Sequence, residues 1–72
     1  MKSYATNTKV KWSWGNGEAA GKVRKVYHES ITKTLKGSEI TRKGTDDNPA
    51  YLIEQDDGDE VLKLHSELEK DS

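Results

Sequence analysis

The stretch that decides the fold is Asn48-Pro49-Ala50-Tyr51-Leu52-Ile53-Glu54-Gln55-Asp56-Asp57-Gly58-Asp59-Glu60-Val61-Leu62-Lys63-Leu64. Its two apolar runs, 50–53 and 61–64, are separated by acidic residues around Asp57-Gly58. An Asp-Gly pair between two such runs favours a β-hairpin, because glycine adopts the positive φ of a tight turn without steric cost. Pro49 suits the position before the first strand, where its missing N–H does not interrupt the ladder. We therefore expect one β-hairpin over residues 48–64.

The turn of this hairpin has two possible registers. A two-residue turn at Asp57-Gly58 places Asp56 opposite Asp59, and like charges directly opposite each other destabilise a sheet. A three-residue turn with Gly58 in the left-handed region opposes Gln55 to Asp59 instead. We expect the three-residue turn.

The chain before this hairpin predicts further short strands. In residues 9–14, Val10, Trp12 and Trp14 alternate with polar residues, which indicates a strand with one buried face. The Gly-Asn-Gly sequence at 15–17 turns the chain back. Residues 30–36 alternate in the same way, and 39–42 follow a turn as a short, polar edge strand.

Residues 18–28 predict a bent strand. Val23 and Val26 are three positions apart, which breaks the two-residue period of a strand, and a β-bulge near Arg24-Lys25 restores it. A helix is the competing interpretation of this spacing. Gly21 and the two β-branched valines disfavour a helix, and turn signals bound the segment on both sides.

The residues after Leu64 predict a single helical turn. Ser66 is the expected N-cap, and Glu67 and Glu69 fall in the first turn, where negative charge suits the helix dipole. Leu68 is the apolar residue that docks this turn against one end of the fold.

Size and composition favour a small closed sheet. The chain has 72 residues, 31% of them apolar, and it contains no cysteine, so neither a disulfide nor a thiolate metal site can stabilise it. Curling the sheet into a barrel stabilises a small β-domain and hides its edges. We expect an all-β barrel of five to six short antiparallel strands over residues 9–70, after a flexible lead-in over 1–8. The expected core is Val10, Trp12, Val23, Val26, Ile31, Leu35, Leu52 or Ile53, Val61 or Leu62, Leu64 and Leu68.

Several short motifs together resemble the hypervirulence-associated Tudor-domain family. They are Val10-x-Trp12-x-Trp14-Gly15-x-Gly17, Ala20-Gly21-x-Val23, Ile40-Thr41-Arg42, Pro49-Ala50-Tyr51-Leu52-Ile53 with Asp56-Asp57-Gly58, and Leu62-Lys63 with Ser66-Glu67-Leu68. The resemblance implies an SH3-like (Tudor-like) barrel without an assigned biochemical activity. The family's apolar-x-x-Gly-Asp lead-in is replaced here by residues 4–8, in which Asn7 can adopt the left-handed conformation.

The resemblance also implies a hypothesis about ligands. Tudor-like folds often bind methylated lysine or arginine in a cage of aromatic rings, through the attraction of a ring face for a cation. The candidate ligand-binding residues are Trp14, Tyr27 and Tyr51, with Glu54 or Asp56 as the charge partner. Trp12 lies in mid-strand on the face of Val10 and is expected in the core, and Tyr51 either lines a groove or packs beneath the loop at 43–48. The leading hypothesis is a non-catalytic module that recognises a protein or peptide partner.

The charge distribution gives the alternative hypothesis, which is nucleic-acid binding. Residues 1–44 hold ten basic and three acidic side chains, whereas residues 45–72 hold two basic and ten acidic ones. The candidate polyanion-binding residues are Lys9, Lys11, Lys22, Arg24 and Lys25, which could form a stripe for phosphates. The overall pI of 6.1 argues against this hypothesis, and mutual attraction of the two halves explains the same pattern.

The sequence does not favour an enzyme, a cofactor or a metal site. Asp56-Asp57-Gly58-Asp59-Glu60 looks like part of a calcium loop, but its spacing places the first ligand on an isoleucine. His28 and His65 are isolated, and no nucleophile lies in a recognisable motif. No run approaches the roughly 20 apolar residues of a membrane span, and no signal peptide opens the sequence. We therefore expect a cytoplasmic monomer that does not bind membranes.

Overall fold

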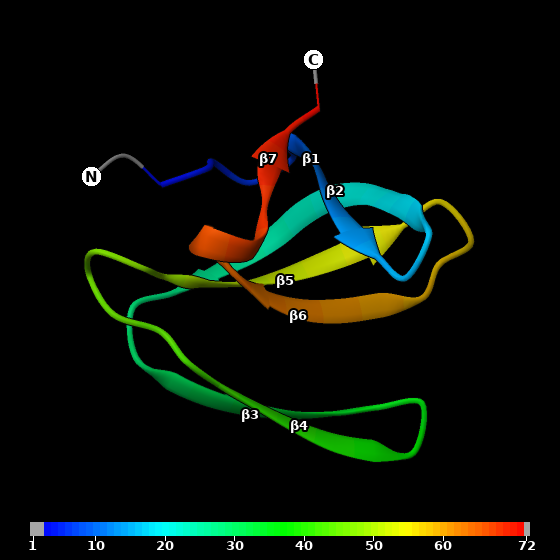
Figure 1. Cartoon of the computed structure of the whole chain (residues 1–72). Coiled ribbons are helices and arrows are strands. Elements are labelled where there is room, and N and C mark those ends of the chain that lie inside the picture. The colour runs from blue at the N-terminus through cyan, green and yellow to red at the C-terminus, as the bar shows by residue number, and fades with distance from the viewer. Residues whose placement is uncertain (1–2, 72) are drawn as a thin grey trace.

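The computed structural model describes residues 3–71 and shows an all-β fold (Figure 1). The elements are β1 (Lys9–Trp14), β2 (Gly17–Tyr27), β3 (Ser30–Leu35), β4 (Ser38–Lys43), β5 (Ala50–Gln55), β6 (Glu60–Leu64), the 3-10 turn η1 (His65–Glu67) and β7 (Glu69–Lys70). Five strands form one antiparallel sheet in the order β6-β5-β2-β1-β7, and β3 pairs with β4 in a second sheet. The predicted small SH3-like all-β fold is confirmed, with β7 as a seventh strand beyond the five or six expected.

The β5–β6 hairpin has the expected register. The last strand pair is Glu54 with Glu60, and beyond it the Gln55 N–H donates to the Asp59 carbonyl over 2.7 Å. The Gly58 N–H donates to the Gln55 carbonyl over 2.9 Å, and Gly58 has a φ of 89°. The three-residue turn is therefore confirmed, and it keeps Asp56 and Asp59 from facing each other across the ladder.

Strand β2 contains the predicted bulge. Val23 pairs with Ile53 and Lys25 pairs with Leu52, so Arg24 is the extra residue on β2. The bulge turns Val23 and Val26 to the same face of the strand, because residues directly opposite each other in a ladder share a face. The segment is a strand throughout, and the helical alternative is wrong.

The five-stranded sheet buries apolar side chains on both faces. One face holds the main core cluster, which is Val10, Trp12, Val23, Tyr51, Ile53 and Leu68. Adjacent residues of a strand point to opposite faces, so Leu52 of β5 and its partner Leu62 of β6 lie on the other face. Both leucines are buried, and the β3–β4 hairpin lies on this side, beyond β5 and β6 (Figure 1).

Most of the predicted core is confirmed, with four corrections. Val26, Ile31, Leu35 and Leu64 are half-buried rather than buried. Ile31 and Leu35 belong to β3–β4, which pairs with no strand of the main sheet and covers it from one side only. Both alternatives at 52–53 are buried, because β5 is covered on each face, whereas at 61–62 Leu62 is buried and Val61 is half-buried.

The predicted helical turn is present, but Ser66 is not its N-cap. The turn begins at His65, and the Leu64 N–H donates to Glu67 Oε1 over 3.0 Å. The Ser66 N–H donates to Asn48 Oδ1 over 2.9 Å, which ties the turn to the loop before β5. Leu68 is buried as expected, and Glu69 lies in β7 rather than in the first helical turn.

The segment before β1 contacts the sheet. Asn7 has a φ of 74°, which confirms the expected left-handed conformation, and its N–H donates to the Val23 carbonyl over 2.7 Å. The Val23 N–H donates to the Thr8 carbonyl over 3.0 Å. Tyr4 stacks on His65 with 4.7 Å between ring centroids. The flexibility expected for residues 1–8 is a statement about motion and stays a prediction.

Candidate functional site

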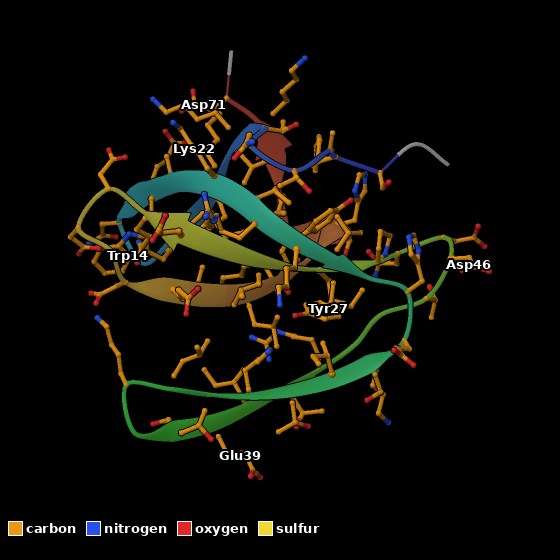
Figure 2. The ribbon with its side chains drawn as sticks, turned by 180° about the vertical axis from the view of Figure 1, so that it is seen from behind. Trp14, Lys22, Tyr27, Glu39, Asp46 and Asp71 are labelled. Carbon is orange, nitrogen blue, oxygen red and sulfur yellow. The ribbon has the colours of Figure 1, made fainter. Side chains whose placement is uncertain are left out.

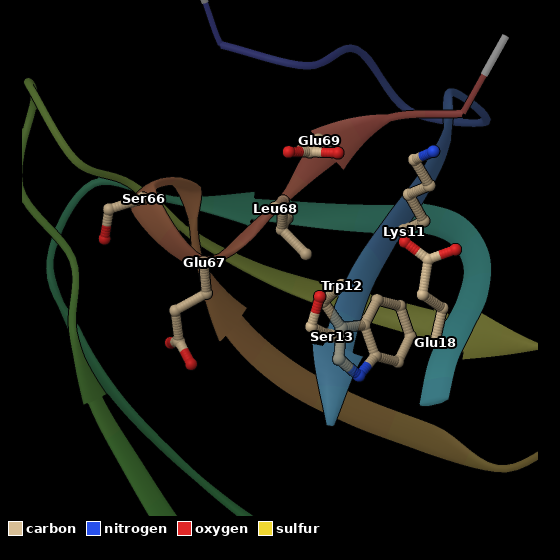
Figure 3. Close-up of a pocket in the computed structure, with 8 residues that line it drawn as sticks. All are labelled: Lys11, Trp12, Ser13, Glu18, Ser66, Glu67, Leu68 and Glu69. Atoms are coloured by element: carbon tan, nitrogen blue, oxygen red, sulfur yellow. The ribbon is translucent and has the colours of Figure 1, made fainter. Parts of the chain in front are cut away.

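A cleft lies beside the outer edge of β1 (Figure 3). Its volume is about 380 Å³. It is lined by Lys11, Trp12, Ser13, Glu18, Ser66, Glu67, Leu68 and Glu69. These residues come from β1, the start of β2, η1 and the start of β7.

The cleft exists because β7 is much shorter than β1. Strand β7 pairs with β1 only at Val10 and Lys11. The Asp71 N–H donates to the Lys9 carbonyl over 2.9 Å, so the backbone groups of Lys9 point to this edge. Backbone groups alternate between the two edges of a strand, so the N–H and C=O of Ser13 point to the same edge, beyond the end of β7.

The floor of the cleft is part of the core. Trp12 is 5% exposed and Leu68 is 7% exposed, and both belong to the main core cluster. Side chains packed in a core occupy single rotamers, so the floor is preformed. Figure 3 shows Leu68 pointing toward the indole of Trp12.

The walls of the cleft carry more negative than positive charge. Three glutamates, Glu18, Glu67 and Glu69, line it together with one lysine, Lys11. Glu67 is already paired, with Arg42 Nε at 3.6 Å and Lys63 Nζ at 3.8 Å. Within residues 3–71, neither Glu18 nor Glu69 takes part in an ion pair. Among the described residues, these two carboxylates are therefore left without a cationic partner.

The four predicted ligand-binding residues do not come together. Trp14 is 62% exposed at the end of β1, beside the start of β2, whereas Tyr27 lies at the far end of β2 (Figure 2). The Lys33 Nζ lies 5.8 Å from the centre of the Tyr27 ring and thus occupies one face of it. Glu54 is exposed and lies 4.0 Å from Arg24. A cage built from this set of rings is not present in the described residues.

Tyr51 is a structural residue. It is fully buried, its hydroxyl accepts from the Tyr4 N–H over 2.9 Å, and it lies 2.8 Å from His65 Nδ1. Burial raises the pKa of the Tyr51 hydroxyl. Of the two placements considered from the sequence, packing is therefore correct, and the packing is against the main core cluster.

The five predicted polyanion-binding residues lie on or beside one face, but acids alternate with them. Lys9 pairs directly with Lys22, and on the other side Lys22 pairs with Glu54. Lys11 pairs with Glu69, and Arg24 lies against Glu54. Lys25 follows the bulge opposite Leu52. Acidic side chains therefore interrupt the basic residues, which do not form a continuous track for phosphates.

Other kinds of site find little support in residues 3–71. This part of the chain holds no cluster of three or more His, Cys, Asp or Glu side chains suited to a metal ion. None of its helices is long and apolar enough to span a bilayer. A second hollow lies over Val26, Tyr27, His28 and Glu29, where His28 Nδ1 is 3.7 Å from Asp46 Oδ1.

Sequence reasoning missed the cleft. Its two walls, residues 11–18 and 66–69, are about fifty positions apart, and the pairing that joins them involves only two residues of β1. No local pattern predicts so short a strand. The available signal was the Ser-Glu-Leu-Glu sequence at 66–69, in which one apolar residue is flanked by two carboxylates at alternate positions.

The fold and the cleft define a small all-β domain of the SH3-like class with an acidic surface site. The family model for the Tudor domain of hypervirulence-associated proteins matches residues 8–68, and the chain belongs to this family. The resemblance identified in the sequence is therefore confirmed. No curated protein and no solved structure matches the chain. Family membership indicates a small binding module.

Proposed function

We propose that this protein is a non-catalytic module that binds a positively charged segment of a partner protein or peptide in the cleft beside β1. One observation carries the proposal. The carboxylates of Glu18 and Glu69, which form no ion pair within residues 3–71, stand at the wall of a preformed cleft whose floor is Trp12 and Leu68. We take the module to act as a cytoplasmic monomer, as expected from the sequence.

A lysine or arginine side chain suits this arrangement. Its aliphatic stem packs on apolar surface while its charged head stays with the carboxylates. A hydrogen bond to a charged group contributes about 1.5–3 kcal/mol in favourable geometry, so one basic side chain alone gives weak binding. The exposed ring of Trp14, which follows Ser13 along β1, offers further apolar contact to the same segment.

Of the predicted ligand-binding residues, only Trp14 is part of the proposed site. Trp14 is retained because it is exposed next to the cleft. Tyr51 is omitted because it is fully buried, and Tyr27 and Glu54 lie on other parts of the surface with partners of their own. Nucleic-acid binding by the basic residues is an outcome that the test distinguishes.

The test is a titration of isotope-labelled protein with short peptides that differ only in lysine or glutamine at one position. We expect the lysine peptide to shift the amides of Ser13, Glu18 and Glu69 and the indole of Trp14. The double variant Glu18→Gln, Glu69→Gln should weaken binding by at least about tenfold, since two charge-assisted contacts are lost.

The matched control is Glu39→Gln. Glu39 is an exposed glutamate of β4, on the side of the molecule opposite to Asp71, which follows β7 (Figure 2), and its substitution makes the same change of charge as either single replacement in the double variant. This variant should bind like the original protein. Equal affinity for the two peptides would contradict the proposal. Shifts centred on Lys9, Lys22 and Lys25 with an oligonucleotide, weakening with salt, would favour the nucleic-acid alternative.

A further inference from the structure

We infer that the bound segment is an extended strand that pairs with the open edge of β1 at Ser13 and prolongs the line of β7. This inference rests on the proposed function, and it specifies how the basic segment is held. Strand addition supplies affinity through main-chain hydrogen bonds and specificity through alternate side chains.

The position of the open edge supports this mode of binding. Strand β1 runs to Trp14, but the β7 pairing ends at Lys11. At the opposite end of the sheet, β6 lies next to the β3–β4 hairpin (Figure 1). The edge at Ser13 therefore combines an exposed strand with an adjoining cleft, between β1 and η1, that has room for another chain.

The length of the edge limits the length of the pairing. Lys11 already pairs with Glu69, and beyond Trp14 the chain turns at Gly15 with a φ of 49°. Ser13 is thus the residue whose N–H and C=O are directed to the open edge. One partner residue exchanges hydrogen bonds with Ser13 and one of its neighbours lies opposite Trp14, while the other neighbour lies beside Leu68, which itself takes the position opposite Trp12.

Strand geometry assigns a side chain to each of these three positions. The residue opposite Ser13 points to the same face as Ser13 and Glu18, which pair with each other across β1 and β2. Two strand spacings separate it from Glu18, about 10 Å between backbones. The small Ser13 side chain lies between them, so a lysine or arginine reaches across it to the Glu18 carboxylate.

The two neighbouring residues point to the opposite face. One lies beside Leu68 at the floor of the cleft, and the other lies toward the exposed ring of Trp14. Both environments favour apolar side chains. The structure therefore assigns the occupant as an extended apolar-basic-apolar sequence of a partner protein.

The experiment compares two peptides that contain Val-Lys-Val in a flexible polar context. One has a normal backbone, and the other carries an N-methyl group on the lysine nitrogen. The methyl group removes the N–H that donates to the Ser13 carbonyl but keeps the side chain and its charge. We expect the methylated peptide to bind roughly tenfold more weakly, and a peptide with valine and lysine exchanged, Lys-Val-Lys, to bind weakly as well.

A protein variant provides the reciprocal comparison. Ser13→Pro removes the N–H on the open edge, where proline does not disturb the β1–β2 ladder. The Ser13→Pro variant should bind the normal peptide more weakly by a similar factor. The Glu39→Gln variant should bind this peptide as tightly as the original protein does. The comparison of the methylated and normal peptides uses the unaltered protein. It therefore tests strand addition even if the Ser13→Pro variant does not fold.

The outcomes separate this inference from the proposed function. Equal binding of the methylated and normal peptides, with loss of both in the Glu18→Gln, Glu69→Gln variant, would overturn strand addition and leave the basic-segment site standing. Absence of binding by every basic peptide would overturn both. Self-association of the free protein through the Ser13 edge would show that the occupant is a second copy, which also overturns the inference.

Discussion

Gly21 shows how closely the strands of this small core approach each other. A Cβ on Gly21 would lie 2.6 Å from the Glu54 carbonyl oxygen and 2.7 Å from Ile53 Cγ2. The neighbour at 2.6 Å is backbone, which cannot move aside without disturbing the β2–β5 ladder. Glycine is therefore required here by the contact between two central strands.

Gly21→Ala should destabilise the protein by about 1–3 kcal/mol, the usual cost of forcing an extra methyl group into a packed interior. Gly17→Ala is the matched control, because nothing lies within 4 Å of a Cβ at that position. Urea denaturation measures both. Equal stability of the two variants would contradict the close packing of β2 on β5.

The hydroxyl of Tyr51 should contribute to the stability of the fold. Tyr51→Phe removes a hydroxyl that bonds both the Tyr4 N–H and His65 Nδ1. The loss should destabilise the fold by about 1–2 kcal/mol, since partly buried groups are left without partners. Urea denaturation at neutral pH measures this loss, and an unchanged midpoint would show that the hydroxyl contributes nothing.

Ionisation of the same hydroxyl should lower the free energy of unfolding at alkaline pH. Burial raises the pKa of Tyr51, so the folded protein holds this proton more tightly than the unfolded chain does. The stability that results is fully present below the ordinary tyrosine value of about 10 and is lost as pH rises beyond it. Denaturation at several pH values should show a steeper alkaline loss in the original protein than in Tyr51→Phe. Parallel curves for the two proteins would contradict the pKa shift.

The two hairpins are linked at their tips. Lys36 Nζ, in the β3–β4 turn, lies 2.7 Å from Asp59 Oδ2, beyond the β5–β6 turn. The hydrogen bond between them raises the pKa of Lys36 and lowers that of Asp59. Because β3–β4 forms a sheet of its own, this contact helps to hold it over Leu52 and Leu62.

Asp59→Asn should therefore speed amide hydrogen exchange in β3 and β4 more than in the main sheet. Asp56→Asn, which changes the same charge in the same turn, is the control, since Asp56 is in none of the ion pairs of residues 3–71. Because the pKa of Asp59 is lowered, the link is fully present in and above the ordinary aspartate range and is lost only as pH falls below that range, through the lowered pKa. Uniform exchange across both sheets in Asp59→Asn would contradict this role.

The elements that sequence could predict are those with local signals. The three-residue turn at Gly58 follows from avoiding an Asp56–Asp59 pair, and the β2 bulge follows from the spacing of Val23 and Val26. Strand β7 has only the weak signal of the Ser-Glu-Leu-Glu sequence at 66–69, because it is defined by two residues that pair with β1 far away in sequence. Since β7 frames the cleft, the candidate site could not be predicted for the same reason.

Across the whole molecule, basic side chains of residues 1–44 form ion pairs with acidic side chains of residues 45–72. Four of the five ion pairs within residues 3–71 join a base before Gly44 to an acid after it, namely Arg24–Glu54, His28–Asp46, Lys36–Asp59 and Arg42–Glu67. The fold therefore uses much of its charge internally. Two glutamates at the cleft, Glu18 of the basic half and Glu69 of the acidic half, are in none of these five ion pairs.

This pairing predicts that salt weakens the fold modestly. Added salt weakens the attraction between exposed charges, because the Debye length shortens as the ionic strength rises. The urea midpoint should therefore be lower in 0.5 M sodium chloride than in 20 mM, by roughly the small amount expected of exposed ion pairs. A higher midpoint in salt would show that repulsion within each half outweighs attraction between them.

The central claim is that a basic extended segment occupies the cleft beside β1. The most direct measurement is a set of intermolecular nuclear Overhauser effects between labelled protein and a Val-Lys-Val peptide. We predict contacts from the lysine to Ser13 and Glu18, and from the valines to Leu68 and Trp14. Contacts confined to the region of Tyr27 and Lys25, or none at all with a peptide shown to bind, would contradict it.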